Sequence, residues 1–176
     1  LLCEQAIKII GNSNARVLDL CTGSGCIAAV VASKTNASVT ASDVSEKALA
    51  VARENCQGLN VECVQSDMFG KLFARIFDVI ISNPPYIRSG DLDSLQKEVQ
   101  REPLTALDGG EDGLKFYREI AEKSPEFLAE NSVLLLEIGF DQASEVSALL
   151  SVNFTDVQVI KDLEGNDRII IARKKN

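Results

Sequence analysis

The sequence contains no histidine, and its five cysteines form no Cys-x-x-Cys pair. Because zinc sites are built chiefly from closely spaced cysteines and histidines, this composition argues against a metal site. Without histidine the chain also lacks the side chain that most often serves as a general base near neutral pH. An odd number of irregularly spaced cysteines favours free thiols, and we therefore expect a cytoplasmic protein.

Long apolar runs and basic clusters are also scarce. No run approaches the roughly 18 apolar residues that a membrane-spanning helix needs, and no basic leader with an apolar stretch opens the chain, so we expect no membrane contact. The formal net charge is −8, and the only basic cluster is Arg173–Lys175 at the end of the chain. Because nucleic-acid-binding domains usually carry a basic face, this charge argues against a nucleic-acid partner and suits a cationic ligand or a basic protein.

The 176 residues have an ordinary globular composition and predict a single domain with a substantial core. They begin at Leu1 rather than at methionine, which predicts that the chain is a piece of a longer protein. Apolar periodicity and chain breakers predict helices over 1–10, 26–33, 45–56, 92–100 (in part), 114–130 and 142–150, and strands over 17–20, 38–42, 61–65, 77–82, 133–138, 155–160 and 168–172. This alternation predicts an α/β fold with a doubly wound, mostly parallel, seven-stranded sheet, helices on both faces and an antiparallel last strand.

An Asn-Pro-Pro-Tyr sequence directly follows the predicted strand over 77–82. Asn83 precedes a proline and is therefore biased towards an extended conformation, while Pro84 and Pro85 have a fixed φ and no N–H. The loop therefore leaves the sheet rigidly, and the carbonyls of the Asn83 side chain and the Pro84 backbone form two neighbouring acceptors that fit a planar NH2 group. An ordinary strand-ending turn explains the same four residues equally well.

Polar residues or glycine follow four consecutive predicted strands. These positions are the segment 19–25, Asp43, Asp67 and Asn83. In parallel sheets, ligands bind at the carboxyl ends of the strands, near the point where the strand order reverses. Four such strand ends together predict a ligand site at that edge of the sheet.

Two classes of cofactor fit this edge. The segment 23–28 matches G-x-G-x-x-A, and Asp43 lies 18 residues beyond Gly25. Both features belong to the dinucleotide-binding fingerprint, so a nicotinamide-dependent dehydrogenase stays an alternative function. However, Asp19 at the exit of the first strand would repel a pyrophosphate, and Asp67 adds a third carboxylate. Three carboxylates suit a cationic cofactor without phosphate, such as S-adenosylmethionine, whose product is S-adenosylhomocysteine.

The motifs together resemble a known enzyme family. The segment 19–25, Asp-Leu-Cys-Thr-Gly-Ser-Gly, resembles the first motif of class I S-adenosylmethionine-dependent methyltransferases. With Asn-Pro-Pro-Tyr at 83–86 and Glu-Pro-Leu-Thr-Ala-Leu at 102–107, the whole chain resembles the catalytic domain of release-factor glutamine methyltransferases. These enzymes methylate the side-chain amide of the glutamine in the Gly-Gly-Gln motif of peptide-chain release factors. The resemblance implies a Rossmann-like methyltransferase fold over 1–176, without the family's amino-terminal helical domain, and a release factor as partner.

The resemblance also implies roles for individual residues. Asp43 would accept the ribose hydroxyls, Asp67 would accept the adenine amine, and Asn83 with the Pro84 carbonyl would bind the substrate amide. The plainer interpretations are a helix cap for Asp43, a loop cap for Asp67 and a packing ring for Tyr86. The implied cofactor-binding residues are Asp19, Thr22, Gly23, Gly25, Asp43, Asp67, Met68 and Asn83, the implied catalytic residues are Asn83, Pro84 and Tyr86, and Pro85 completes the implied substrate site.

One departure from the family pattern concerns the glycine loop, where Cys21 replaces the usual first glycine. Cysteine adopts a positive φ at a cost, so we expect the first turn of the loop to differ slightly while the cofactor still binds. The Asn-Pro-Pro-Tyr sequence is shared with adenine-amine methyltransferases of DNA and RNA, which stay an alternative. A cofactor-binding domain without activity also stays open.

Overall fold

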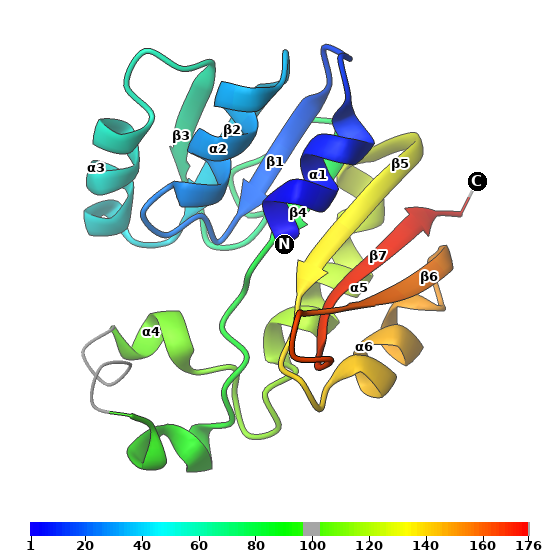
Figure 1. Ribbon diagram of the computed structural model, residues 1–176. Helices are drawn as coiled ribbons and strands as arrows, with labels where there is room; N and C mark the ends of the chain where they lie inside the picture. The colour runs from blue at the N-terminus through cyan, green and yellow to red at the C-terminus, as the bar shows by residue number, and fades with distance from the viewer. Residues whose placement is uncertain (97–102, 176) are drawn as a thin grey trace.

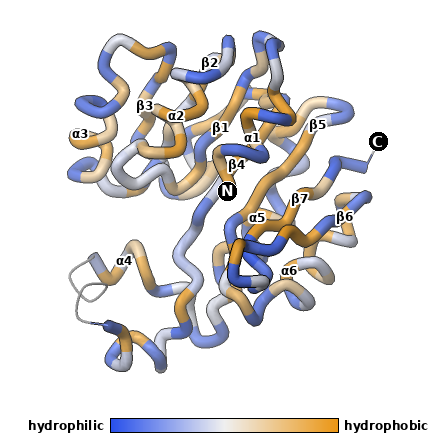
Figure 2. The backbone as a smooth tube through the Cα atoms, viewed as in Figure 1, coloured by the Kyte–Doolittle hydropathy of each residue, from blue (hydrophilic) through white to orange (hydrophobic). Residues whose placement is uncertain are grey.

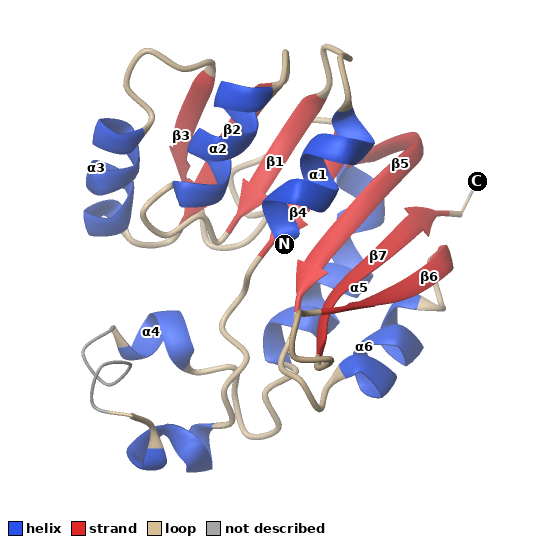
Figure 3. Ribbon diagram, in the orientation of Figure 1, coloured by secondary structure: helices blue, strands red, loops and turns tan. Residues whose placement is uncertain are grey.

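The computed structural model describes residues 1–96 and 103–175, and a single sheet of seven strands forms its centre (Figure 3). The strand order is β3-β2-β1-β4-β5-β7-β6, in which β7 runs antiparallel to both its neighbours and the other pairs are parallel. The strands are β1 (Arg16–Leu20), β2 (Ser38–Asp43), β3 (Val61–Gln65), β4 (Phe77–Ser82), β5 (Leu128–Glu137), β6 (Phe154–Lys161) and β7 (Asp167–Lys174). The predicted fold class is confirmed.

Helices cover both faces of the sheet (Figure 1). Helices α1, α2 and α3 pack on one face, and α5 and α6 pack on the other. A short α4 and a 3₁₀ helix lie in the segment that follows β4, beyond the carboxyl ends of the parallel strands. The helix bounds are α1 (Leu2–Ile10), α2 (Cys26–Lys34), α3 (Glu46–Asn55), the 3₁₀ helix (Ser89–Ser94), α4 (Leu104–Leu107), α5 (Lys115–Phe127) and α6 (Ala143–Leu150).

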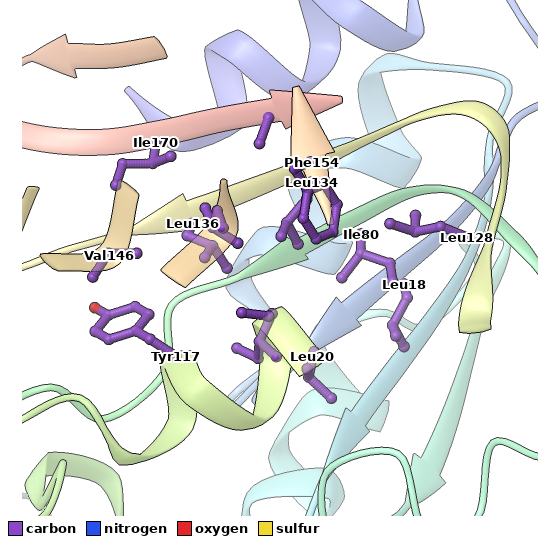
Figure 4. Close-up of a cluster of buried hydrophobic side chains, with 14 of the residues drawn as sticks. Leu18, Leu20, Ile80, Tyr117, Leu128, Leu134, Leu136, Val146, Phe154 and Ile170 are labelled. Atoms are coloured by element: carbon purple, nitrogen blue, oxygen red, sulfur yellow. The ribbon is translucent and has the colours of Figure 1, made fainter. Parts of the chain in front are cut away.

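The central strands are buried on both faces, which explains their nearly continuous apolar runs. Leu134 and Leu136 of β5 pack with residues of α5 and α6 on one face, where Figure 4 shows Leu134 next to Phe154 and Leu136 on the side of Val146. Leu135 of β5 packs on the other face with residues of α1 and α2. The backbone coloured by hydropathy is correspondingly apolar along the middle of the sheet (Figure 2). Two apolar layers therefore hold the sheet in place between its helices.

Most predicted boundaries lie within two residues of the observed ones, and larger differences occur in two segments. The helix predicted over 114–130 ends at Phe127, and the strand predicted from residue 133 already begins at Leu128. Leu128 pairs with Phe77 of β4, so the residues from 128 onwards join the sheet, although their local pattern also suits a helix. In the segment predicted to be partly helical over 92–100, a 3₁₀ helix begins earlier, at Ser89, and residues 97–100 lie outside the described residues.

Within the part of the chain that the structure describes, no helix combines the length and the apolar character required to cross a membrane.

Candidate active site

The carboxyl ends of β1, β2, β3 and β4 surround a cavity of about 410 Å³. The fold therefore brings together the four strand ends that the sequence singled out. Among the residues predicted to form the site, those that line the cavity are Thr22, Gly23, Asp43, Asp67, Met68, Asn83 and Pro85.

Asp19 lies beneath the glycine loop and is fully buried. Its Oδ2 accepts hydrogen bonds from Thr22 Oγ1 at 2.5 Å and from the Ala28 N–H at 3.0 Å, which tie the loop to the first turn of α2. Its Oδ1 is buried and has no hydrogen-bond partner among the described residues. Burial raises the pKa of Asp19 to about 7, although the bonds from Thr22 and Ala28 act in the opposite direction. An orphaned carboxylate oxygen therefore lies under the wall of the cavity.

The glycine loop contains three residues with positive φ: Cys21 at 60°, Gly23 at 56° and Gly25 at 79°. Cys21 thus adopts the left-handed conformation that glycine favours, at a cost of roughly 1–2 kcal/mol. A Cβ at Gly23 would meet no atom within 4 Å, whereas a Cβ at Gly25 would lie 2.9 Å from the Ala52 Cβ of α3. Gly23 therefore leaves room at the cavity, and Gly25 serves the packing of α2 against α3.

Asp43 connects the glycine loop to the start of α3. Its Oδ2 accepts a hydrogen bond from the Gly23 N–H at 2.9 Å, and its Oδ1 accepts one from the Ser45 N–H at 2.8 Å. The N-cap bond of α3 comes instead from Ser45, whose Oγ accepts from the Ala48 N–H at 3.2 Å. The backbone thus holds the Asp43 carboxylate at the cavity wall, and each oxygen keeps a lone pair for a further donor.

The far wall of the cavity comes from the residues after β3. Asp67 is exposed at the cavity, while Met68 is buried and has a φ of 43°. The Cys21 thiol donates to the Met68 sulfur across 3.8 Å, which joins this wall to the glycine loop. Burial raises the pKa of Cys21 to about 12, so its thiol stays protonated and unreactive at neutral pH.

The Asn-Pro-Pro-Tyr corner begins beside the glycine loop. Ser82 Oγ donates to the Leu20 carbonyl at 2.7 Å and so joins the ends of β4 and β1. Asn83 is exposed and lines the cavity together with Pro85, whereas Pro84 and Tyr86 are outside its lining. Tyr86 packs against the apolar core on the α5 side of the sheet.

The segment around α4 closes the opposite side of the cavity. Pro103, Thr105 and Ala106 line it together with Phe116 of α5. The backbone that leaves the corner is fastened to this segment, because the Ile87 N–H donates to the Leu107 carbonyl at 3.0 Å. Sequence reasoning assigned no role to these four lining residues. The Glu-Pro-Leu-Thr-Ala-Leu motif marked the segment, although Glu102 itself lies outside the described residues.

The chemistry of the lining favours a cationic ligand. Asp43 and Asp67 line the cavity, Asp19 lies beneath it, and the described lining includes no lysine or arginine. A phosphate-bearing ligand would meet carboxylates there without a compensating cation. The described residues also hold no group of three or more histidine, cysteine, aspartate or glutamate side chains that could bind a metal ion.

Comparison with known sequences agrees with this site. Residues 5–110 match the family model described as "Methyltransferase small domain". The chain is 42% identical to a release factor glutamine methyltransferase of Thermodesulfovibrio yellowstonii, over 99% of this chain and 66% of the relative. A relative of the same name from Agrobacterium fabrum is 44% identical over 97% of this chain and 61% of the relative. The chain thus spans two thirds or less of the length of these relatives. The resemblance that the motifs indicated is confirmed.

Comparison with solved structures agrees with the fold. A methyltransferase from Pyrococcus furiosus matches with a TM-score of 0.70 and 21% identity, over 98% of this chain and 81% of that one. A 16S rRNA N2 G1207 methyltransferase from Thermus thermophilus, solved with AdoMet and guanosine, matches with a TM-score of 0.70 and 18% identity, over 99% of this chain and 42% of that one. At these identities the likeness concerns the fold alone.

Proposed function

Because the chain belongs to the methyltransferase small domain family, we propose that it transfers a methyl group from S-adenosylmethionine to a protein glutamine. The acceptor is the side-chain amide nitrogen of the glutamine in the Gly-Gly-Gln motif of a peptide-chain release factor. The name shared by its relatives supports this substrate. The observation that carries the proposal is the meeting of Asn83 with the carboxylates of Asp43 and Asp67 at one cavity.

The residues at the cavity fit S-adenosylmethionine. The Asp43 carboxylate would accept the ribose hydroxyls, Asp67 would accept the adenine amine, and the glycine loop over Asp19 would hold the methionine end. Thr22 and Gly23 are the residues of that loop that would contact the ligand, and Met68 would contact it from an apolar wall of the cavity. The orphaned Oδ1 of Asp19 and a lining without basic residues both suit a ligand with positive charge.

The reaction requires positioning and electrostatics rather than a base. Bound S-adenosylmethionine supplies an electrophilic methyl group on a sulfonium, which is left as a neutral thioether. A carboxamide nitrogen is a weak nucleophile because its lone pair is delocalised into the carbonyl group. The Asn83 side-chain carbonyl and the Pro84 backbone carbonyl accept hydrogen bonds from the two N–H groups of the substrate amide. These bonds localise electron density on the nitrogen and stabilise the positive charge that develops there. The surplus proton then leaves to water, and no histidine is needed.

We assign residues 1–176 to one catalytic domain, and we propose that it acts in the cytoplasm, where release factors function. The cysteines of the chain are free, which agrees with that location.

Mass spectrometry tests the proposal. A purified release factor is incubated with this chain and S-adenosylmethionine, and we expect a mass gain of one methyl group on the glutamine of its Gly-Gly-Gln motif. The Asn83→Ala variant should methylate it about 10²–10³-fold more slowly, by analogy with the loss of one oxyanion-hole donor. A release factor that stays unmodified in the presence of the wild-type chain would refute the proposal.

DNA and RNA oligonucleotides serve as the second arm of the same experiment, because an Asn-Pro-Pro-Tyr slot also suits the amine of a flipped adenine. The net charge of −8 favours the protein substrate. Methylation of an oligonucleotide without methylation of the release factor would show that the substrate is nucleic acid. Membership of a methyltransferase family argues against the alternative function of a nicotinamide-dependent dehydrogenase.

A further inference from the structure

The side chain of Gln142 lies between the Asn-Pro-Pro-Tyr corner and the loop that follows β5. The residue is the N-cap of α6 and is 3% exposed. Its Nε2 donates to the Tyr86 carbonyl at 3.0 Å and to the Gly113 carbonyl at 3.2 Å. Its Oε1 accepts a hydrogen bond from the Gly139 N–H at 2.9 Å. A single buried amide thus joins the corner, the turn before α5 and the loop after β5.

Three buried glycines make room for this arrangement. A Cβ at Gly113 would lie 2.5 Å from the Tyr86 carbonyl oxygen and 2.7 Å from Gln142 Nε2. A Cβ at Gly139 would lie 2.8 Å from Gln142 Oε1, and one at Gly109 would lie 2.7 Å from the Tyr86 Cα. All these separations are shorter than real Cβ contacts. The backbone therefore closes around Tyr86 so tightly that the Gln142 amide has one place in which all three of its bonds form.

The corner is the part of the site whose placement matters most to the proposed reaction. Asn83 contributes a side-chain acceptor and Pro84 a backbone acceptor. Because Pro84 and Pro85 have fixed φ angles, few backbone angles can absorb a rotation of the Tyr86 peptide before it reaches these acceptors. Misplacement by about 1 Å can cost an enzyme roughly 10²-fold in rate.

We propose that Gln142 is a positioning residue of the transfer reaction, because its amide holds the Tyr86 carbonyl and thereby orients the Asn83–Pro84 acceptor pair. This inference rests on the proposed function. Gln142 is outside the lining of the cavity, so its loss should affect turnover and leave cofactor binding unchanged.

Two substitutions of Gln142 test this role. Gln142→Glu keeps the acceptor for the Gly139 N–H but turns a carboxylate oxygen towards two carbonyls, and Gln142→Met removes all three hydrogen bonds at nearly constant volume. The turnover number and KM for a release factor are measured with tritiated S-adenosylmethionine, the cofactor Kd by calorimetry and stability by urea denaturation. We expect the turnover number to fall about 10- to 100-fold in both variants, with a cofactor Kd within about twofold of wild type.

Asn153 provides a matched control at the other end of α6. Its Nδ2 donates at 3.1 Å to the Ala121 carbonyl, which lacks its usual helical donor because Pro125 has no N–H. Asn153→Ala therefore also removes a bond from a side-chain amide to a backbone carbonyl, far from the corner. We expect it to lower stability and keep the wild-type turnover number. An equal loss of turnover in the Asn153 and Gln142 variants, or wild-type turnover in both, would overturn the inference.

An activity-independent measurement separates this inference from the proposed function. The chain has two tyrosines, so labelling with carbonyl-¹³C tyrosine yields two carbonyl NMR signals, which Tyr117→Phe assigns. In Gln142→Met the Tyr86 signal should shift upfield as its hydrogen bond is lost, while the Tyr117 signal stays in place. If the Tyr86 signal does not move, the inference is wrong, whatever substrate the wild-type chain methylates. If no release factor is methylated but the signal moves, only the proposed function fails.

Discussion

At the scale of single residues, Asp43 is the side chain on which the proposed cofactor binding depends most directly. Its carboxylate is held by the Gly23 and Ser45 N–H groups and still lines the cavity. Hydrogen bonds to charged groups contribute about 1.5–3 kcal/mol. We therefore expect Asp43→Ala to weaken S-adenosylmethionine binding by about one to two orders of magnitude, as measured by calorimetry.

Ser45→Ala is the matched control for that variant. It removes the N-cap bond to the Ala48 N–H and should cost about 1 kcal/mol of stability, but it leaves the Asp43 carboxylate in place. Cofactor affinity should then stay close to that of the wild type. If both variants weaken binding equally, Asp43 acts by holding the start of α3 through the Ser45 N–H and not by binding the ribose.

Asp19 predicts a dependence of stability on pH. Burial raises its pKa in the folded chain from 3.8 to about 7, so the folded state binds this proton more tightly than the unfolded state does. Its contribution to stability is therefore fully present below about pH 4 and is lost as the pH rises through about 7. Relative to the non-titrating Asp19→Asn variant, the wild type should lose free energy of unfolding over this range in urea denaturation. A difference that stays constant with pH would contradict the raised pKa.

At the scale of elements, Gly25 determines how closely the start of α2 approaches α3. Gly25 and Gly58 share a φ of 79°, but an added Cβ would lie 2.9 Å from the Ala52 Cβ at Gly25 and would meet nothing within 4 Å at Gly58. Both Gly→Ala substitutions should lower stability, because alanine adopts a positive φ at a cost in free energy. Gly25→Ala should destabilise the chain by an additional 1–3 kcal/mol or so, because it overpacks the helix contact.

Urea denaturation of both variants measures this difference. Equal destabilisation of the Gly25 and Gly58 variants would show that backbone strain, and not the contact between α2 and α3, explains the glycine.

The elements also show where local patterns suffice. The strands predicted over 61–65 and 77–82 have the observed bounds of β3 and β4, because short apolar runs between clear breakers allow few alternatives. The end of α5 was predicted three residues too late. Its last turn and the start of β5 have similar local preferences, and the pairing of Leu128 with Phe77 decides between them. A contact across 51 residues is not part of a local pattern.

At the scale of the whole molecule, the net charge of −8 should favour binding of a cation. S-adenosylmethionine carries a sulfonium charge that S-adenosylhomocysteine lacks, so the two ligands form a matched pair. The Debye length falls from about 10 Å at 0.1 M to about 3 Å at 1 M salt. Calorimetry over this range should show the affinity for S-adenosylmethionine falling a few-fold more than that for S-adenosylhomocysteine. Equal salt dependence would argue against a role of the protein's field.

The amino-acid sequence alone determined how strands and helices alternate along the chain, the place of the Asn-Pro-Pro-Tyr segment directly after β4 and a composition without histidine. These properties follow from local preferences and from composition, which act over a few neighbouring residues or over none. Only the tertiary structure decided that Gly25 serves helix packing and that Gln142 holds the Tyr86 carbonyl across 56 residues of chain. Such contacts form when distant segments are brought together in the folded core, where a buried amide must find its partners.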